Sequence, residues 1–131
     1  MGSNGPSGPV VVYPQAEAFD PVPSFTGAWS GKVERKQGEL QLGILRAGEY
    51  FGNFTAADGS LDIALHLEQS SATTASGAQV PSNRLLFTWQ DGEGGRGHGW
   101  FTIDREGSAL EGSSGVGQAI DGVAWLFERE G

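Results

Sequence analysis

The side chains that could do chemistry are few in this chain, and their spacing forms no recognisable catalytic set. Two histidines, His66 and His98, cannot hold zinc without carboxylate ligands, and the absence of cysteine excludes Cys-based metal and redox sites. A general base needs a nucleophile and an orienting partner within hydrogen-bond reach. The serines that follow His98, at positions 108, 113 and 114, show no triad-like spacing. We therefore expect no enzyme, no metal site and no cofactor.

A glycine-rich segment, Asp91–Gly99 (DGEGGRGHG), superficially looks like a phosphate-binding loop. Such loops work because a helix follows and directs its N–H groups at the anion. Here the strand-like segment Trp100–Ile103 follows, and the carboxylates of Asp91 and Glu93 would repel phosphate. We interpret the segment as a hairpin tip with His98 as a solvated turn residue.

The carboxylates are spread along the chain, without the spacing of a calcium-binding loop. Glycoside cleavage needs two carboxyl groups held close together in a cleft. The acidic residues instead fall on turns or on outward positions, and His66 shares an outward position between two leucines. These acidic residues are Glu34, Glu39, Asp62, Asp104, Glu106, Glu111 and Asp121. We interpret them as solvated charges.

The charge balance limits the classes of partner. The net charge is −8, with only 8 scattered Lys and Arg residues, so neither a nucleic acid nor an anionic membrane surface is an expected partner. No apolar run approaches the ~20 residues of a membrane-spanning helix, so we expect no membrane span. No signal peptide is recognisable. Localisation stays open: the protein is cytoplasmic or, if the Met-Gly-Ser opening is a cloning remnant, exported.

The elements that must position these residues are short strands. From Phe25 onward apolar and polar residues alternate with period two, which is typical of half-buried strands. Many of the 22 glycines lie between these alternating segments, where they favour tight turns, as at Asp58-Gly59. The expected strands lie in 25–35, 39–44, 50–55, 61–67, 84–90, 97–104, 108–113 and 122–129.

Eight short strands with hairpin-length connections predict one all-β domain. We expect a single antiparallel up-and-down β-barrel of about eight strands over residues 25–131. Closure would remove the exposed edges that favour aggregation. The one long connection is the polar segment 69–83, which we expect to be a loop.

Residues 1–24 form a separate, Pro/Gly-rich N-terminal arm that contains every proline except Pro81. This proline density disfavours helix and central strand and favours an extended state. The arm carries the apolar residues Val10, Val11, Val12, Tyr13 and Phe19, which are the candidate partner-binding residues. We expect it to contribute little to barrel stability and much to association with other protein subunits.

Several motifs resemble the calycin group of meander barrels, which includes the lipocalins and avidins. They are Gly27-Ala28-Trp29 on the first strand, Arg129 on the last, and the avidin-like strand sequences Leu85–Trp89 and Gly99–Ile103. The resemblance covers residues 25–129, and uncharacterised bacterial Gly/Trp-rich barrel domains are similar. It implies that Arg129 (failing that, Arg105) stacks on a buried Trp29 at a closed barrel end. The polar residues that contact biotin in avidin have no counterpart here, so no ligand identity is implied.

The four tryptophans, Trp29, Trp89, Trp100 and Trp125, lie on different expected strands and on apolar faces. An eight-stranded barrel is just wide enough for side chains to fill, so these residues are expected in the core. The alternative is that they line a pocket for a small hydrophobic ligand.

Two functions follow as hypotheses. The leading one is a non-enzymatic interaction module, an accessory subunit docked to a larger assembly through its arm and barrel surface. The alternative is a calycin-type barrel that binds a small hydrophobic ligand in a Trp-lined cavity. A barrel enzyme is a third hypothesis that no motif supports.

Overall fold

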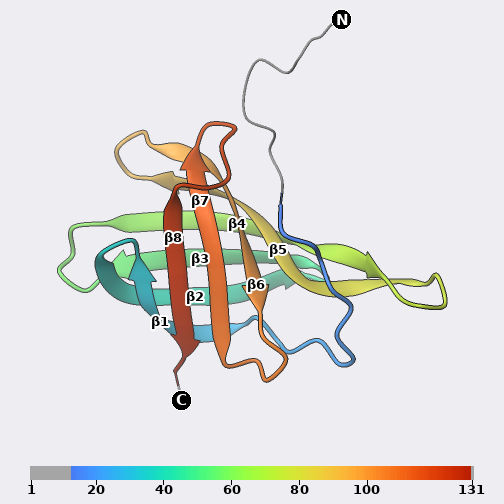
Figure 1. The fold of residues 1–131 in the computed structure, drawn as a ribbon. Helices are drawn as coiled ribbons and strands as arrows, with labels where there is room; N and C mark the ends of the chain where they lie inside the picture. Colours follow the sequence, from blue (N-terminus) through green and yellow to red (C-terminus); the bar gives the residue numbers. More distant parts are fainter. Residues whose placement is uncertain (1–12, 131) are drawn as a thin grey trace, which may run out of the picture.

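The structure is a computed structural model that describes residues 13–130, and this range contains eight strands and no helix. The strands are β1 (Gly27–Val33), β2 (Lys36–Arg46), β3 (Glu49–Ala56), β4 (Asp62–Thr73), β5 (Gln79–Asp91), β6 (Arg96–Ile103), β7 (Ala109–Val116) and β8 (Val123–Arg129). Each strand pairs antiparallel with the next in sequence order, and β8 returns to β1 to close a barrel (Figure 1). The predicted all-β, up-and-down, eight-stranded barrel is confirmed.

The seam between β1 and β8 requires a very close approach of two backbones. A Cβ atom added to Gly31 would lie 1.9 Å from the carbonyl oxygen of Leu126, so only glycine fits at this position. The register across the seam places Trp29 opposite Arg129 and Val33 opposite Trp125. Barrel closure therefore brings the first and last strands together and sets up the contacts at both barrel ends.

The core follows the period-two pattern of the strands. Buried residues alternate with exposed ones on β3 and β4, where Tyr50, Phe54, Ile63, Leu65 and Leu67 face inward. The inward side chains of all eight strands form one continuous apolar core. No helix in residues 13–130 is long and apolar enough to cross a membrane.

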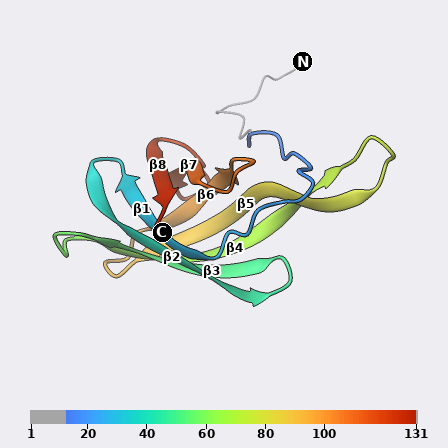
Figure 2. The same cartoon turned by 90° about the horizontal axis from the view of Figure 1, so that it is seen from below.

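The expectation of a loop over 69–83 is wrong, because β4 and β5 continue through most of it. Ser71, Ala72 and Thr73 pair with Pro81, Val80 and Gln79, after a register irregularity that follows Gln69. The resulting two-stranded ribbon projects beyond the barrel wall (Figures 1 and 2). Both faces of most of such a ribbon meet water, so it lacks the apolar alternation by which sequence patterns reveal a strand.

The described part of the arm, residues 13–26, lies along the base of this ribbon and the adjacent barrel end (Figure 2). The Asn83 side chain accepts a hydrogen bond from the Glu17 backbone N–H (2.7 Å), and the Asn83 N–H donates to the Glu17 carbonyl (3.0 Å). Arg84 donates to the Pro14 carbonyl (2.5 Å), and Val22 packs against the core. The arm thus covers part of the β5 edge that β6 leaves unpaired.

Candidate functional site

One end of the barrel is closed by a tryptophan and an arginine. Trp29 is fully buried, and the Arg129 guanidinium lies 4.2 Å from the centre of its ring. Arg129 also donates to the carbonyl oxygens of Gly107 (2.8 Å), Thr26 (2.8 Å) and Ser24. The Trp29 indole N–H donates to the Phe25 carbonyl at 3.0 Å. The predicted stacking of Arg129 on a buried Trp29 is confirmed, and this end offers no entry.

The middle of the barrel is filled with aromatic rings. Trp125 packs against Phe54, Phe87 and Phe101 with ring centroids 6.0, 5.3 and 5.5 Å apart. Phe127 contacts the same group and is buried. Edge-to-face and tilted contacts of this kind add to the burial energy of large rings. No through-going cavity is therefore left for a long ligand.

The opposite end opens into a shallow mouth with a volume of about 240 Å³. Trp89 and Trp125 line it, and aliphatic side chains from three strands or their turns complete the wall. The aliphatic residues are Val33, Leu61, Ile63 and Val123. Trp125 is fully buried in the barrel, whereas Trp89 is half-buried near the rim and anchored by its indole N–H to the Gly115 carbonyl at 3.1 Å. The mouth is thus an apolar recess with two indoles in its wall.

One buried polar side chain, Ser114, lines this recess. It is 3% exposed, and its Oγ accepts a hydrogen bond from the Trp125 indole N–H at 2.9 Å. A serine hydroxyl carries one donor as well as its acceptor lone pairs. Within residues 13–130 the Ser114 hydroxyl has no acceptor for its proton. Buried polar groups usually have partners, so this free donor marks a place where a ligand acceptor atom fits.

Charged groups stand at the rim of the mouth. Glu34 and Asp91 line it, and the Asp91 Oδ1 is already bonded to the N–H groups of Glu93 (2.9 Å) and Gly95 (2.8 Å). Lys36 is held 3.3 Å from Asp58. Hydrogen bonds from Ser60, with Lys36 contributing, lower the pKa of Asp58 to about 2. The rim is therefore polar and mainly acidic, above an apolar interior.

The four predicted tryptophans do not share one cavity. Trp29 lies at the closed end, while Trp89 and Trp125 lie at the mouth. The expected apolar position of Trp100 is wrong: it is half-buried on the outer side of β6, because the alternating Phe101 and Ile103 take the inward positions. The predicted Trp-lined pocket is thus reduced to two of the four residues.

The arm residues predicted to bind partners are only partly described. Val10, Val11 and Val12 lie outside the described residues. Tyr13 is half-buried beneath Arg84, whose guanidinium lies 5.6 Å from the ring centre, and Phe19 lies 4.3 Å from the guanidinium of Arg105. Both described aromatic anchors therefore contact this chain's own barrel.

Neither histidine lines the mouth. His66 is exposed on β4, as predicted, with its Nε2 3.2 Å from a Glu49 carboxylate oxygen. His98 is not a turn residue: it lies half-buried on β6, and its Nδ1 is 2.5 Å from the Gly117 carbonyl. The glycine-rich segment does form the β5–β6 hairpin, as expected. No group of His, Asp and Glu residues that could hold a metal ion occurs within the described chain.

Sequence reasoning missed Ser114, although a signal existed. On β7 every second residue faces inward, at Leu110, Gly112 and Ser114. This alternation by itself predicts a polar residue inside the barrel. The alternation along β7 did not show that the neighbour of Ser114 is the Trp125 indole, which comes from β8.

No known protein family, no curated protein and no solved structure matches this chain.

Proposed function

We propose that the protein is a non-enzymatic binding module that takes a small, mostly apolar ring compound in the barrel mouth. The observation that carries this proposal is the buried Ser114 hydroxyl, which has a free donor inside an apolar recess. A ligand with one oxygen acceptor would satisfy this donor, and its ring would lie against Trp89 and Trp125. This is the calycin-type alternative of the two functions expected from the sequence.

The size of the mouth limits the ligand. Pockets for drug-sized ligands span about 300–1,000 Å³, and the mouth has about 240 Å³. Because aromatic rings fill the barrel below, a long-chain lipid does not fit. The acidic rim at Glu34 and Asp91 disfavours anions. A neutral single-ring compound with a carbonyl or hydroxyl group suits the site best.

The interaction module remains the second proposal. It is favoured by the exposed apolar residues Ile44, Leu45 and Phe51 of the β2–β3 hairpin, each at least half exposed. Clustered exposed apolar residues often mark contact surfaces. For the arm the support is weaker, because its described aromatic residues contact the chain's own barrel.

A matched pair of probes tests the mouth. Acetophenone and ethylbenzene have nearly the same shape, but only acetophenone carries a hydrogen-bond acceptor. Titration of the full chain by calorimetry, with Trp fluorescence as a second readout, should show tighter binding of acetophenone by about fivefold or more, as expected for a hydrogen bond worth about 1 kcal/mol. In the double variant Ser114→Ala/Trp125→Phe, which removes the hydroxyl and also the indole N–H that loss of the hydroxyl would free, this preference should disappear.

A second variant checks the location of binding. Val123→Trp places a large ring in the mouth and should abolish binding of both probes. Leu126→Trp, on the same strand but facing outward, is the matched control and should bind normally. If neither probe binds the wild-type chain, or if Val123→Trp binds as well as the wild type, the mouth is not a ligand site.

A further inference from the structure

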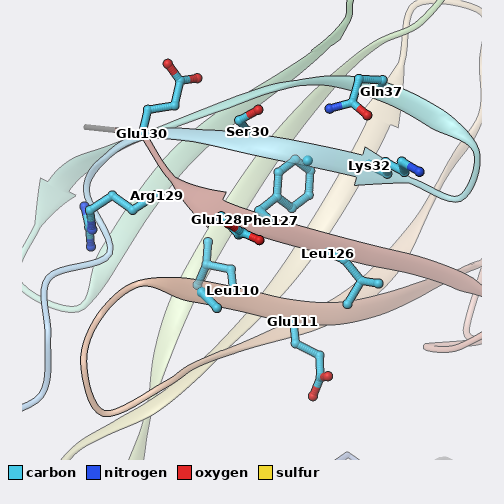
Figure 3. A pocket seen from close by; sticks show the side chains of 12 residues that line it. Ser30, Lys32, Gln37, Leu110, Glu111, Leu126, Phe127, Glu128, Arg129 and Glu130 are labelled. Carbon is cyan, nitrogen blue, oxygen red and sulfur yellow. The ribbon is translucent and has the colours of Figure 1, made fainter.

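The outer face of the seam strands contains a broad, shallow hollow of about 680 Å³, remote from the mouth interior. It spreads over β7, β8 and β1, and Figure 3 shows the side chains around it. The register gives a regular grid: Lys32, Leu126 and Glu111 form one cross-strand row. Small residues lie in the next row, where Ser30 and Ala109 flank Glu128. The hollow forms because these small side chains stand between larger ones.

An apolar side chain stands in this hollow without cover. Leu126 is 55% exposed and lies between the longer side chains of Lys32 and Glu111. Leu126 therefore offers one apolar contact point on an otherwise polar strand face.

The charges on this face are unbalanced. Glu111, Glu128 and Glu130 line the hollow and Glu39 lies beside it, opposite Ser30 on β2, whereas the cations of the lining are Lys32 and Arg129. Ion pairs in residues 13–130 involve Lys36, Arg46 and His66, so none of the four glutamates is ion-paired there. The Arg129 guanidinium stacks on Trp29 and donates to backbone carbonyls. The neighbouring Glu39 carboxyl raises the pKa of the Glu130 carboxyl. A cation placed beside two neighbouring carboxylates would relieve the repulsion between them.

We propose that this face docks a basic, extended polypeptide segment with the pattern apolar-x-basic-x-basic. Leu126, Glu128 and Glu130 stand at every second position along one strand direction. Alternate side chains of an extended chain are about 7 Å apart, on β8 and on the ligand alike. A segment that lies along β8 can therefore place one apolar and two cationic side chains over these three residues. Charge complementarity selects such a partner over the neutral or acidic segments of other proteins.

The test uses the peptide acetyl-Leu-Ser-Arg-Ser-Arg-amide and the full chain labelled with nitrogen-15. At low salt, the peptide should shift the backbone amide signals of β1, β7 and β8. Glu128→Gln should weaken binding about two- to fivefold, which is the contribution of one exposed ion pair. The double variant Glu39→Gln/Glu130→Gln should weaken it further, and high salt should weaken it in all chains.

Two controls separate a defined surface from general attraction to an acidic protein. Glu68→Gln on β4 removes the same charge from another part of the outer wall and should leave the affinity unchanged. The peptide acetyl-Leu-Arg-Arg-Ser-Ser-amide has the same composition without the period-two pattern and should bind more weakly. The proposal is overturned if the shifts fall on other strands, if Glu68→Gln has the same effect as Glu128→Gln, or if no binding occurs at low salt.

Discussion

The two ends of the barrel use the same residue type in opposite ways. At the closed end the Trp29 indole donates to the Phe25 backbone carbonyl, and Arg129 covers the ring and bonds three further carbonyls. At the mouth the Trp125 indole donates to the Ser114 side chain, whose own proton has no described acceptor. At the closed end the Trp29 indole and the Arg129 guanidinium both have hydrogen-bond partners. At the mouth the Ser114 hydroxyl proton has no acceptor within the described chain. This difference is the basis of the ligand site that we propose at the mouth.

The N-terminal arm also distinguishes the two ends of the barrel. Residues 13–26 cover the closed end and the base of the β4–β5 ribbon, while no segment of the described chain covers the mouth. The closed end is thus reinforced by chain that is remote from β8 in sequence, whereas the mouth rim consists of hairpin turns.

The largest expected effect is a loss of stability when Trp29, which fills the closed end, is truncated. Trp29→Ala empties a large, fully buried site and should destabilise the protein by about 3–5 kcal/mol. Urea unfolding followed by circular dichroism measures this change. Trp100→Ala, which removes a half-buried indole on the outer wall, is the control and should cost clearly less. An equal loss in the two variants would remove the distinction between plug and wall.

The next effect concerns the arm. From the sequence we expected residues 1–24 to add little stability, but the contacts of Glu17, Val22 and Arg84 argue for the opposite. Deleting residues 1–24 leaves the buried Asn83 without its arm partner and uncovers apolar surface. We expect a loss of about 2–4 kcal/mol.

The matched deletion of residues 1–12 retains all of these contacts and should keep nearly the full free energy of unfolding. Unfolding curves of both truncated chains measure the difference. If the two deletions are equally stable, the arm does not reinforce the closed end, and the original expectation stands.

At the mouth, Ser114→Ala should destabilise the protein by about 1–3 kcal/mol, because it leaves the buried Trp125 indole N–H unpaired. Ser113→Ala, the neighbouring half-buried position on β7, is the control and should change stability little. The chemical shift of the Trp125 indole N–H should also change in Ser114→Ala but not in Ser113→Ala. No change in this signal would mean that the Ser114–Trp125 hydrogen bond does not form in solution.

The smallest expected effect is on the pKa values of two turn aspartates, Asp58 and Asp104. Asp58 at the mouth rim has its pKa lowered to about 2, first by Ser60. At the closed end, burial of Asp104 opposes its ionisation, but hydrogen bonds from Ser108, Ala109 and Gly107 outweigh it and lower the pKa. Ser60→Ala should therefore raise the pKa of Asp58 toward its ordinary value and leave that of Asp104 unchanged, as measured by carboxyl carbon-13 titration.

The sign of the stability change follows from the lowered pKa. A carboxyl whose pKa is depressed by folding stabilises the protein above its unfolded-state pKa, and this contribution fades as the pH falls. The difference in stability between the wild type and Ser60→Ala should thus be present above about pH 4 and shrink as the pH falls toward 2. A difference that is independent of pH would contradict the assignment.

Several features could be read directly from residue patterns. Alternation along Leu61–Leu67 and the Asp58-Gly59 turn predicted the first half of β4 and its hairpin with β3, because a strand with one face in the core must alternate. The pairing of Trp29 with Arg129 followed from a resemblance in two short motifs and is present in the structure. The ribbon beyond the barrel escaped prediction because most of its side chains face solvent on both sides.

The sequence by itself determined the number of strands, their order and most of their inward faces, since these depend on local periodicity and on turn residues. Only the tertiary structure decided which interior residues meet. Ser114 and Trp125 are brought together by pairing of β7 with β8, and Trp100 is excluded from the interior by the parity of β6. The plug and the acidic outer face lie at the seam where the first and last strands, β1 and β8, become neighbours on closure. Hairpin-length connections predict which consecutive strands pair, but not their register, so which side chains meet across a pair became visible only in the closed barrel.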